Sequence, residues 1–543
     1  MSMGRNTRQN QASRQSRSRT SFAASLGAAP LKGGAAMSAY QGASHTDLAL
    51  SDWQPMAGSA DADLLPELGT LTSRARDLAR NDGLMAGGLQ THRDNVVGAV
   101  LRLSAVPDYR LLGWTPEQAR EWGNKVEAHF RSWADTTDCD AARTLDLLGL
   151  TVLALGGEMV NGDAVAIPKW LPRPDSPWAT RLSVIEADRL ETPPYLEGMA
   201  RIRRGVELDG EGAPVAYHFR AAHPGDALYL RGDEAQDLNR WERVPAFTPW
   251  GRRRVVHLHA KERTGQSRGK PIVSAVMREF HMAGKYAQNE LQASLANSLV
   301  AAFLESDLSQ EAASALFGDQ ARDVWKESVT QSRSIGKLQA GAVIPLPVGA
   351  RLQSFAPGRP NVAFEAFMLA VERRIAAGMN LPYELFAKDF SRVNYSSARA
   401  ALLEAWRYFH GRRRWLTTTW LRPIYELWLE EAVNAGVIDA PGFYANRYAY
   451  TRCRFVFGGK GWVDPVKEVQ AAKLRLEIGV STLEQECAEQ GLDWEEVLHQ
   501  QRLEAECRRE HGLPEPGATT WIANTSDNGS DKEEGAPARK DAP

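Results

Sequence analysis

The sequence has few cysteines, no long apolar run and no excess of charge of one sign. Its four cysteines lie far apart and none forms a C-x-x-C pair. They therefore predict no structural zinc site and favour a reducing, intracellular compartment. The longest apolar stretch, Leu147–Leu155, is interrupted by Gly149 and Thr151. It is far shorter than the roughly 18 residues that span a bilayer. The basic N-terminus has no apolar segment of the kind that a secretory signal needs.

The near-balance of charge excludes a bulk cationic coat for nucleic acid. Lys and Arg together number 65 and Asp and Glu 67, which gives a net charge of −2 over 543 residues. A nucleic-acid coat protein would carry a large positive excess. The balance leaves room for local basic patches. Sixteen tryptophans are many, and they indicate extensive packing between elements or subunits.

Motifs for catalysis are also missing. Gly265–Lys270 resembles a phosphate-binding loop, but only three residues separate its glycines and Pro271 stands where Ser or Thr would hold Mg²⁺. We interpret it as a turn before a helix. His257 and His259 would share one face of a strand, but no third or fourth ligand follows at metal-site spacing. The sequence therefore predicts no enzyme activity, no cofactor and no metal.

The order of periodic segments predicts an α+β fold that is mainly helical. A capping box at Thr115 begins an amphipathic helix, and residues 145–260 alternate short apolar stretches with turns, which favours strands. We expect a helix from Pro271 to about residue 297, a second over 310–330, and short strands within 342–348. An apolar stripe from Phe364 to Met379 predicts another helix.

A loop over 383–395 should precede a long helix that starts at Ser396 or Ser397. Pro423 should kink this helix, because proline lacks a backbone donor. After an aromatic, strand-like section at 443–457, residues 465–510 should be helical, with a second capping box starting at Ser481. Residues 1–45 and the last 30 residues are polar and should be disordered tails. For the basic first tail, contact with nucleic acid or a scaffold partner is the alternative.

Two basic features are candidates for function. The first is on the long helix, where arginines alternate with aromatic residues: Arg407, Arg412, Arg413 and Arg414. These arginines are candidates for contact with a neighbouring subunit or with phosphate. The second is the loop between the two helices, which carries Lys388, Arg392, Asn394 and Tyr395. A loop held by rigid helices is a common place for function, although an ordinary surface connection has the same pattern.

Several sequence blocks, in this order, resemble the lambda-type family of tailed-bacteriophage portal proteins. The blocks run from residue 75 to residue 493: Ala75–Gly83, His92–Gly98, Thr264–Gly269, Leu381–Leu385, Asn394–Ala400, Phe409–Arg414, Gly479–Thr482 and Glu486–Asp493. The basic first 45 residues match nothing in the family. The resemblance implies a portal architecture of wing, stem, clip and crown around a central DNA channel.

The resemblance also implies which residues form each region. The regions are a disordered tail (1–45), the wing (46–270), a first stem helix (271–297), the clip (298–357), a second stem helix (358–382), a channel-lining tunnel loop (383–396), a long channel-side helix with a return to the wing (397–462), the crown (463–512) and a second tail (513–543). By the same resemblance, Lys388, Arg392, Asn394 and Tyr395 would face DNA.

The implied function is structural. A ring, usually of twelve subunits, would sit at one capsid vertex of the virion after assembly in the cytoplasm of the bacterial host. It would contact double-stranded DNA, the terminase packaging motor, capsid or scaffold proteins and head-completion proteins. Two other interpretations stay open: a DNA-packaging nuclease or ATPase, which would need a phosphate loop and clustered acids, and a capsid protein that forms no channel.

Overall fold

The structure is a computed structural model that describes residues 40–45, 47–304, 342–345, 363–461 and 465–513. The chain divides into two compact units, Met1–Gly58 and Ser59–Pro543. The described part of the first unit holds one short 3-10 helix, Gln41–Ala43. Nearly all of the two predicted tails lies outside these residues. Within the described ranges, no helix is both long and apolar enough to cross a membrane.

The second unit opens with helices. They are α1 (Ala60–Leu64), α2 (Leu68–Asn81), α3 (Gly83–Val96), α4 (Tyr109–Leu112), α5 (Pro116–Ala134) and α6 (Leu147–Asn161). The predicted capping box begins α5, because the Thr115 hydroxyl accepts from the N–H of Gln118 and the Gln118 side chain accepts from the N–H of Thr115. The apolar stripe of α5 is buried, as predicted.

The strand-rich section starts later than the sequence suggested, because residues 147–161 form α6. Asp146 caps this helix by accepting a hydrogen bond from the N–H of Gly149 at 2.7 Å. Helix α6 is apolar around most of its circumference and buried, so it lacks the one-sided pattern that marks a surface helix. That is why its apolar run was mistaken for strand.

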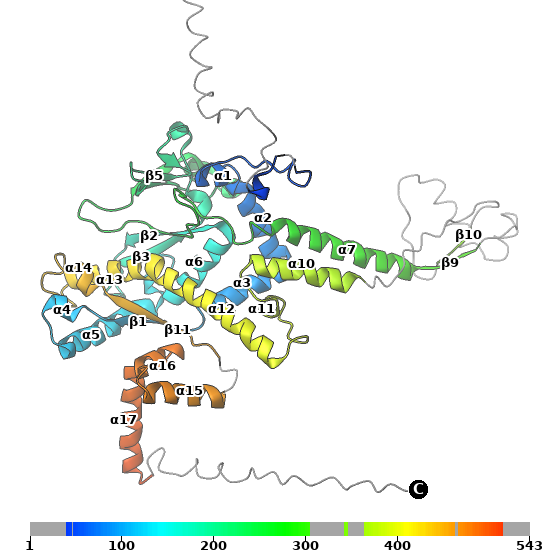
Figure 1. Ribbon diagram of the computed structural model, residues 1–543. Helices are drawn as coiled ribbons and strands as arrows, with labels where there is room; N and C mark the ends of the chain where they lie inside the picture. Colours follow the sequence, from blue (N-terminus) through cyan, green and yellow to red (C-terminus); the bar gives the residue numbers. More distant parts are fainter. Residues whose placement is uncertain (1–39, 46, 305–341, 346–362, 462–464, 514–543) are drawn as a thin grey trace, which may run out of the picture. The chain divides into compact units, whose positions relative to one another are not determined.

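The strands that follow form two antiparallel sheets. They are β2 (Asp163–Trp170), β3 (Thr180–Ile185), β4 (Ile202–Arg203), β5 (Val206–Leu208), β6 (Pro214–Arg220), β7 (Trp241–Pro245) and β8 (Val256–His259). One sheet has the order β3-β2-β8 and the other β4-β5-β6-β7. A separate antiparallel pair joins β1 (Leu101–Ala105) to β11 (Cys453–Phe457), so the chain returns to its N-terminal helices after more than 300 residues (Figure 1).

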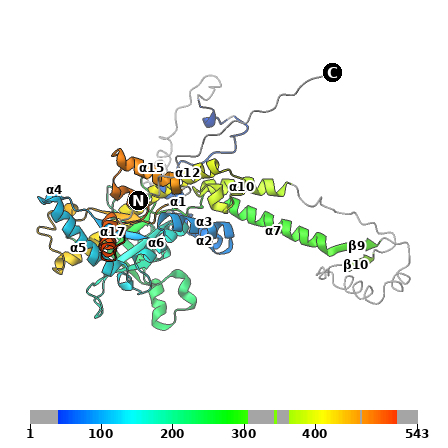
Figure 2. The ribbon, with the colours of Figure 1, turned by 90° about the horizontal axis from the view of Figure 1, so that it is seen from below.

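Two helices then run side by side: α7 (Met277–Leu299) and α10 (Phe364–Gly378). They are in contact through a 2.9 Å ion pair between Arg374 and Glu279 and through the stacked rings of Tyr286 and Phe364. Both views show α10 alongside the first part of α7 (Figures 1 and 2). The predicted start of α7 at Pro271 was wrong. The N–H of Ile272 donates to the carbonyl of Met159 at 2.8 Å, so residues 271–276 turn before the helix begins.

Two short strands follow α7 and precede α10. Strands β9 (Val300–Leu304) and β10 (Ala342–Pro345) pair in parallel. Strand β10 confirms the strand predicted within residues 342–348. The helix predicted over 310–330 lies outside the described residues.

The predicted loop at 383–395 is partly wrong, because residues Tyr383–Ala387 form a short helix, α11. Phe386 of this helix is buried, and its ring packs over Gly88 of α3. A Cβ atom at Gly88 would lie 3.3 Å from that ring. This tertiary contact stabilises a turn of helix too short to show a periodic pattern. Helix α12 (Tyr395–Leu416) follows, and it begins one residue before the earlier of the two predicted starts.

The long helix continues through a wide turn instead of ending at proline. A π-helical turn (Thr417–Leu421) joins α12 to α13 (Arg422–Asn434), and Pro423 is at the first turn of α13. The predicted kink at Pro423 is instead a π-helical turn just before this proline. The wider turn accommodates the backbone donor that proline lacks. Residues 443–457 are only partly extended, since α14 (Arg447–Tyr450) precedes β11.

Three helices form the C-terminal part: α15 (Pro465–Glu477), α16 (Leu483–Glu489) and α17 (Trp494–Glu510). Their presence confirms the helical prediction for 465–510. The second capping box is shifted by one residue, because Thr482 caps α16 with Gln485 as its partner. No residue of α15 or α17 is buried.

One large core holds the second unit together. It contains buried residues from Ala75 to Phe457, and α13 contributes six of them. At its centre, the rings of Phe130 and Trp178 lie 5.1 and 5.0 Å from the ring of Trp428. A smaller cluster lies between the two antiparallel sheets and includes Val165, Tyr217 and Phe219.

Candidate functional site

The loop between α11 and α12, residues 388–394, has a conformation set by its own polar residues. Lys388 ends α11 with a positive φ of 55°. The Asp389 carboxylate accepts from the hydroxyl of Ser391 and from its N–H, the latter at 2.9 Å, and these two bonds lower the pKa of Asp389. Asn394 caps α12 by accepting from the N–H of Ser397 at 2.8 Å. We call this segment the α11–α12 loop.

The side chains of this loop face outward. Lys388, Arg392 and Asn394 are exposed, and the adjoining Tyr395 is 50% exposed. Arg392 pairs with Glu365 of α10, and both side chains are largely in solvent. Such a surface pair contributes at most about 1 kcal/mol, so Arg392 can exchange this partner for another anion.

The start of the loop is anchored in the core. Phe386 and Phe280 pack with ring centroids 6.2 Å apart, which holds α11 against α7. On α3, the Nε2 of His92 donates to the carbonyl of Met379 at 3.0 Å. Both His92 and Met379 are buried. The loop is therefore a short exposed segment that starts from a rigid base.

The four arginines of the long helix have different environments. Arg407 is exposed and pairs with Glu404 of the same helix at 3.0 Å, and Arg414 is exposed. Arg412 forms an ion pair with the buried Glu158 of α6 and lies over the ring of Trp415. Arg413 donates to the carbonyls of Val96, Asn95 and Gly458. These contacts occupy Arg412 and Arg413 within one chain, so the candidates for contact with a subunit or phosphate narrow to Arg407 and Arg414.

A buried polar cluster lies where β2 and β8 pair, and sequence reasoning missed it. We call Asp163, His257, His259 and Arg268 the Asp163 cluster. Asp163 Oδ1 accepts from His257 Nε2 at 2.8 Å and from the N–H of Gly269 at 2.9 Å. Asp163 Oδ2 accepts from Arg268 Nε at 2.7 Å. Burial alone would raise the pKa of Asp163, but the Arg268 charge and His257 outweigh it and hold that pKa below its usual range.

The same cluster fixes the segment that resembled a phosphate loop. The Arg268 guanidinium donates to the carbonyls of Leu190, Arg204 and Ala187, and the N–H of Ser267 donates to Asp61. Gln266, Ser267 and Arg268 are buried. The segment turns toward the protein interior, so it presents no cradle of free amides to a phosphate. Only the spacing of His257 and His259 hinted at the cluster in the sequence, since Asp163 is 94 residues away.

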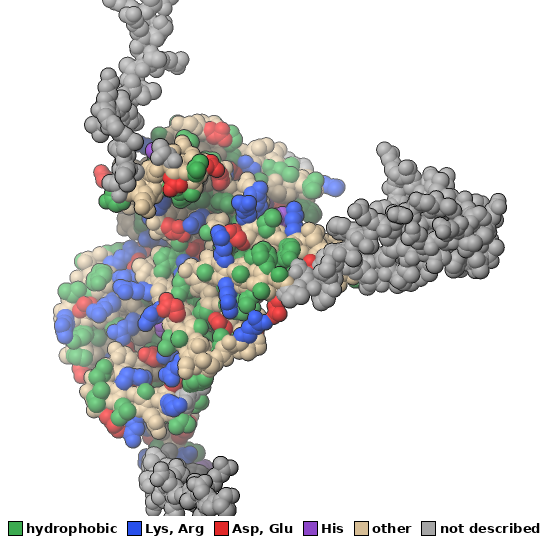
Figure 3. Space-filling view, turned by 45° about the vertical axis from the view of Figure 1, so that its right-hand side comes forward, with side chains coloured by type: hydrophobic (Ala, Val, Ile, Leu, Met, Phe, Trp, Pro, Cys, Tyr) green, Lys and Arg blue, Asp and Glu red, His purple; other side chains and the backbone are tan. Residues whose placement is uncertain are grey.

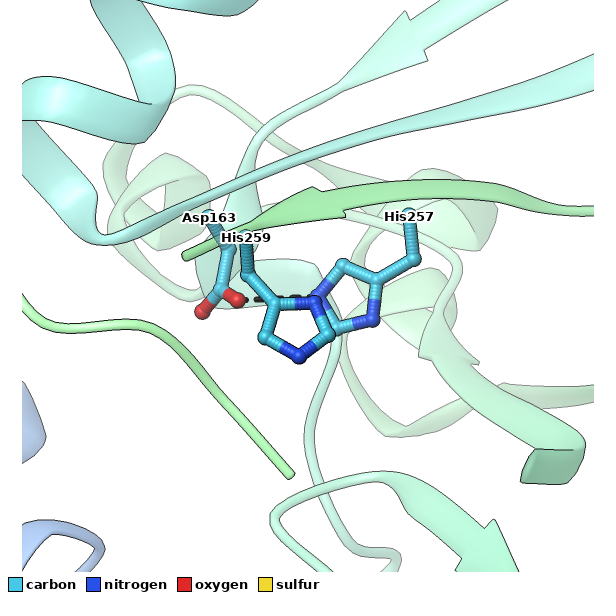
Figure 4. A group of neighbouring side chains, drawn as sticks. All are labelled: Asp163, His257 and His259. Carbon is cyan, nitrogen blue, oxygen red and sulfur yellow. Dashed lines mark hydrogen bonds and ion pairs between the residues drawn. The ribbon is translucent and has the colours of Figure 1, made fainter. Parts of the chain in front are cut away.

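The two histidines stack on one side of β8. Their ring centroids are 4.3 Å apart, and Figure 4 shows both rings and the Asp163 carboxylate converging. Burial lowers the pKa of His259 to about 3, and the neighbouring His257 adds to this effect. Nδ1 of His259 is buried and makes no hydrogen bond to the described part of the chain.

These features match a known class of protein. The family profile for "Phage portal protein, lambda family" matches residues 46–413, which is more than half of the chain. The chain therefore belongs to the lambda family of phage portal proteins, which are structural components of the capsid.

Two curated relatives extend the match beyond that range. The chain is similar to portal protein B of Escherichia phage lambda, with 29% identity over 500 residues that cover 88% of this chain and 91% of the relative. It is similar to the portal protein of Escherichia phage N15, with 29% identity over 510 residues that cover 90% and 94%. These alignments confirm the family resemblance found in the sequence blocks.

A third relative and a solved structure are more distant. The probable portal protein of a Halomonas phage, phiHAP-1, is 26% identical and covers 86% of both chains. A chain from the neck of a native gene transfer agent particle, computed with C12 symmetry, is 14% identical and covers 83% of this chain and 94% of that chain. Its TM-score is 0.36.

Proposed function

We propose that twelve copies of this chain form a ring around a DNA channel at one vertex of a phage capsid. In this role the chain is structural and has no catalytic activity. The observation that carries the proposal is the family match over residues 46–413, together with 29% identity to two portal proteins over about nine tenths of the chain. The genome would enter the head through the ring, be retained there, and leave through it.

The partners follow from this role. A terminase motor would dock on the ring during packaging, and head-completion proteins would dock later. Capsid or scaffold proteins would surround the ring. By the family resemblance, the motor would dock on the clip, residues 298–357. These residues lie mostly outside the described part of the chain, so the assignment of the clip as the docking region rests on the family alone.

Charge supports a conduit for DNA rather than a tight DNA binder. The net charge of the chain is −2, and Figure 3 shows Lys and Arg interspersed with acidic and apolar side chains on the face drawn. Each phosphate that a protein neutralises adds salt-dependent affinity, which would hinder sliding. A mixed surface with a few cations on one loop favours passage.

We assign contact with DNA to the α11–α12 loop, through Lys388, Arg392, Asn394 and Tyr395. Two cations and two hydrogen-bonding side chains are grouped on an exposed segment with a rigid base. Asp389 and Glu365 partly balance the two cations, so the segment offers weak, exchangeable contacts to phosphates.

Electron microscopy of the purified full-length protein tests the ring. We expect hollow particles with about twelvefold symmetry. A separate assay of the same protein should detect no ATP hydrolysis. A monomer or a closed shell would contradict the proposal. ATP turnover would also contradict it, because it would favour a packaging ATPase.

The loop has a separate test. We expect Lys388→Gln with Arg392→Gln to assemble rings normally and to change packaging efficiency or DNA retention in filled heads. The matched control is Arg240→Gln, which removes an exposed arginine paired with Asp237 on the wing. Unchanged packaging and retention in the double variant would remove DNA contact from this loop and leave the ring proposal intact.

A further inference from the structure

The Asp163 cluster brings together three metal-ligand side chains that are distant in sequence. Ligand atoms of Asp163, His257 and His259 all lie within 4.8 Å of one another. Asp163 is paired with His259 in the β2–β8 register, and His257 is two residues away on the same side of β8. The sequence offered only the two histidines, and the fold supplies the carboxylate.

We propose that Asp163, His257 and His259 form a binding site for a divalent transition-metal cation, with Zn²⁺ as the preferred ion. Two imidazole nitrogens and one carboxylate oxygen are a ligand set that suits Zn²⁺, and a water molecule would take the fourth position. The site goes beyond the role of the chain as a portal and does not depend on it.

The unpaired nitrogen of His259 points to a missing ligand. Nδ1 of His259 is buried without a hydrogen-bond partner in the described residues. Buried polar atoms in native proteins are nearly always satisfied, and each exception calls for an explanation such as an ion. A cation between the rings and Asp163 would give this nitrogen a partner.

The contact between His257 and Asp163 shows where the cation would bind. His257 Nε2 and Asp163 Oδ1 are 2.8 Å apart and share one hydrogen. A metal with bonds of about 2.0–2.2 Å to each atom would replace that hydrogen after a small opening of the pair. The His257 imidazole would then carry its one ring hydrogen on Nδ1 instead of Nε2. The ring stays neutral in this change of tautomer.

Arg268 both supports and weakens the site. Its bond to Asp163 Oδ2 fixes the orientation of the carboxylate and leaves Oδ1 directed at His257. Such a partner outside the ligand shell is common in metal sites. The guanidinium also repels a cation, so we expect weaker binding than at a closed structural zinc site.

A second group in the described residues, Glu186, Asp188 and His223, provides the contrast. His223 Nδ1 accepts from the N–H of Gly225 at 2.9 Å, so the ring carries its hydrogen on Nε2. That nitrogen faces Glu186 and Asp188 at 3.0 and 3.5 Å. For His223 Nε2 to bind a metal, its hydrogen would have to move to Nδ1, and that would break the hydrogen bond from Gly225.

The test is metal binding by the full-length protein after treatment with a chelator. Titration with Co²⁺, followed by visible absorption and by competition with Zn²⁺, measures affinity, and elemental analysis after gel filtration measures stoichiometry. We expect one ion per chain, at least about tenfold weaker binding in His259→Ala, and unchanged binding in the matched control His223→Ala. His259→Gln replaces His259→Ala if the latter fails to assemble.

The outcomes separate the alternatives. Absence of stoichiometric binding to the wild-type protein would overturn the proposal and identify the cluster as a hydrogen-bond network alone. Equal binding by the His259 variants and the wild type would also overturn it. Loss of the ion in His223→Ala would move the site to the second group.

Discussion

The half-buried guanidinium of Arg413 ties together three segments of the chain. It donates to carbonyls at the end of α3 and just after β11, and it lies over the rings of Trp406 and Phe457. Burial lowers the pKa of Arg413 to about 10, which leaves it charged at neutral pH. The planar fork of arginine is suited to several acceptors at once, and lysine is not.

Replacement of this fork should be costly. We expect Arg413→Lys to destabilise the protein by about 2 kcal/mol, because one ammonium cannot satisfy three separated carbonyls. Chemical denaturation measures the change. The neighbouring exposed residue gives the control, since Arg414→Lys should change stability by less than about 0.5 kcal/mol. Equal effects of the two substitutions would contradict the role of Arg413.

His92 should make stability depend on acid pH. Burial lowers its pKa to about 4, with a further contribution from the positive Arg412. Between pH 6.5 and 4 the unfolded chain binds a proton at this position more readily than the folded chain does. Stability from neutral His92 is therefore complete above pH 6.5 and falls as the pH drops toward 4, by about 3 kcal/mol in total.

The measurement is a series of unfolding curves from pH 7.5 to 4, in the wild type and in His92→Gln. Glutamine can still donate toward the carbonyl of Met379 but does not titrate. The difference between the two proteins should shrink as the pH falls through this window. A constant difference at every pH would show that His92 does not titrate there.

At the scale of elements, the C-terminal helices dock on β1 and α5 mainly through charges. Glu496 of α17 pairs with Arg102 of β1 and Arg131 of α5, and Asn124 donates to Glu495 at 3.0 Å. Glu127 of α5 lies at the same junction and accepts from the N–H of Ala105 at 2.7 Å. Burial raises the pKa of Glu127 to about 7, and the negative Asp493 and Glu495 add to this effect.

This carboxyl should weaken the protein in alkaline conditions. A raised pKa means that stability is complete below about pH 4.5 and is lost as the pH rises through 7. We expect Glu127→Gln, which can still accept from Ala105, to raise the melting temperature at pH 8 and to have little effect at pH 5. Glu121→Gln on the exposed side of α5 is the control and should show no such pH dependence. The same gain at both pH values would contradict this interpretation.

Local signals predicted most helices, and contacts between distant residues explain the errors. The Thr115 capping box and the stripe of α5 need only neighbouring residues, and both were correct. Helix α11 was missed because its stability comes from Phe386 packing at Gly88, almost 300 residues away. Similarly, no local pattern places Asp163 beside Arg268, or Arg412 beside Glu158. The α11–α12 loop was found because it is a short polar stretch between two strong helices.

At the scale of the whole molecule, burial is very unevenly distributed. Helix α13 has nine buried residues, whereas α15 and α17 have none. The free energy of local opening follows the amount of buried apolar contact. The second unit should therefore open first at its C-terminal helices.

Hydrogen exchange on the full-length protein tests this order. We expect amides of α15 and α17 to exchange at least about a hundredfold faster than those of α13, since local opening is less costly where little is buried. Helix α5 is the internal control, because it is half exposed but has a buried stripe and should be intermediate. Equal protection in α13 and α17 would show that the C-terminal helices are covered by contacts beyond one chain.

The aromatic cluster around Trp428 has a practical consequence. Trp133, Trp178, Trp420 and Trp428 are fully buried in the core, whereas α15–α17 contain a single tryptophan, Trp494. Emission from the core indoles should be blue-shifted, while Trp494 sits in a half-exposed position where its emission would be red-shifted. The intrinsic fluorescence should thus contain a blue-shifted signal from the core and a red-shifted signal from Trp494 together with the exposed Trp53, Trp170 and Trp250. A blue-edge measurement would report on the core without any attached dye, whereas the red edge combines Trp494 with the other exposed tryptophans.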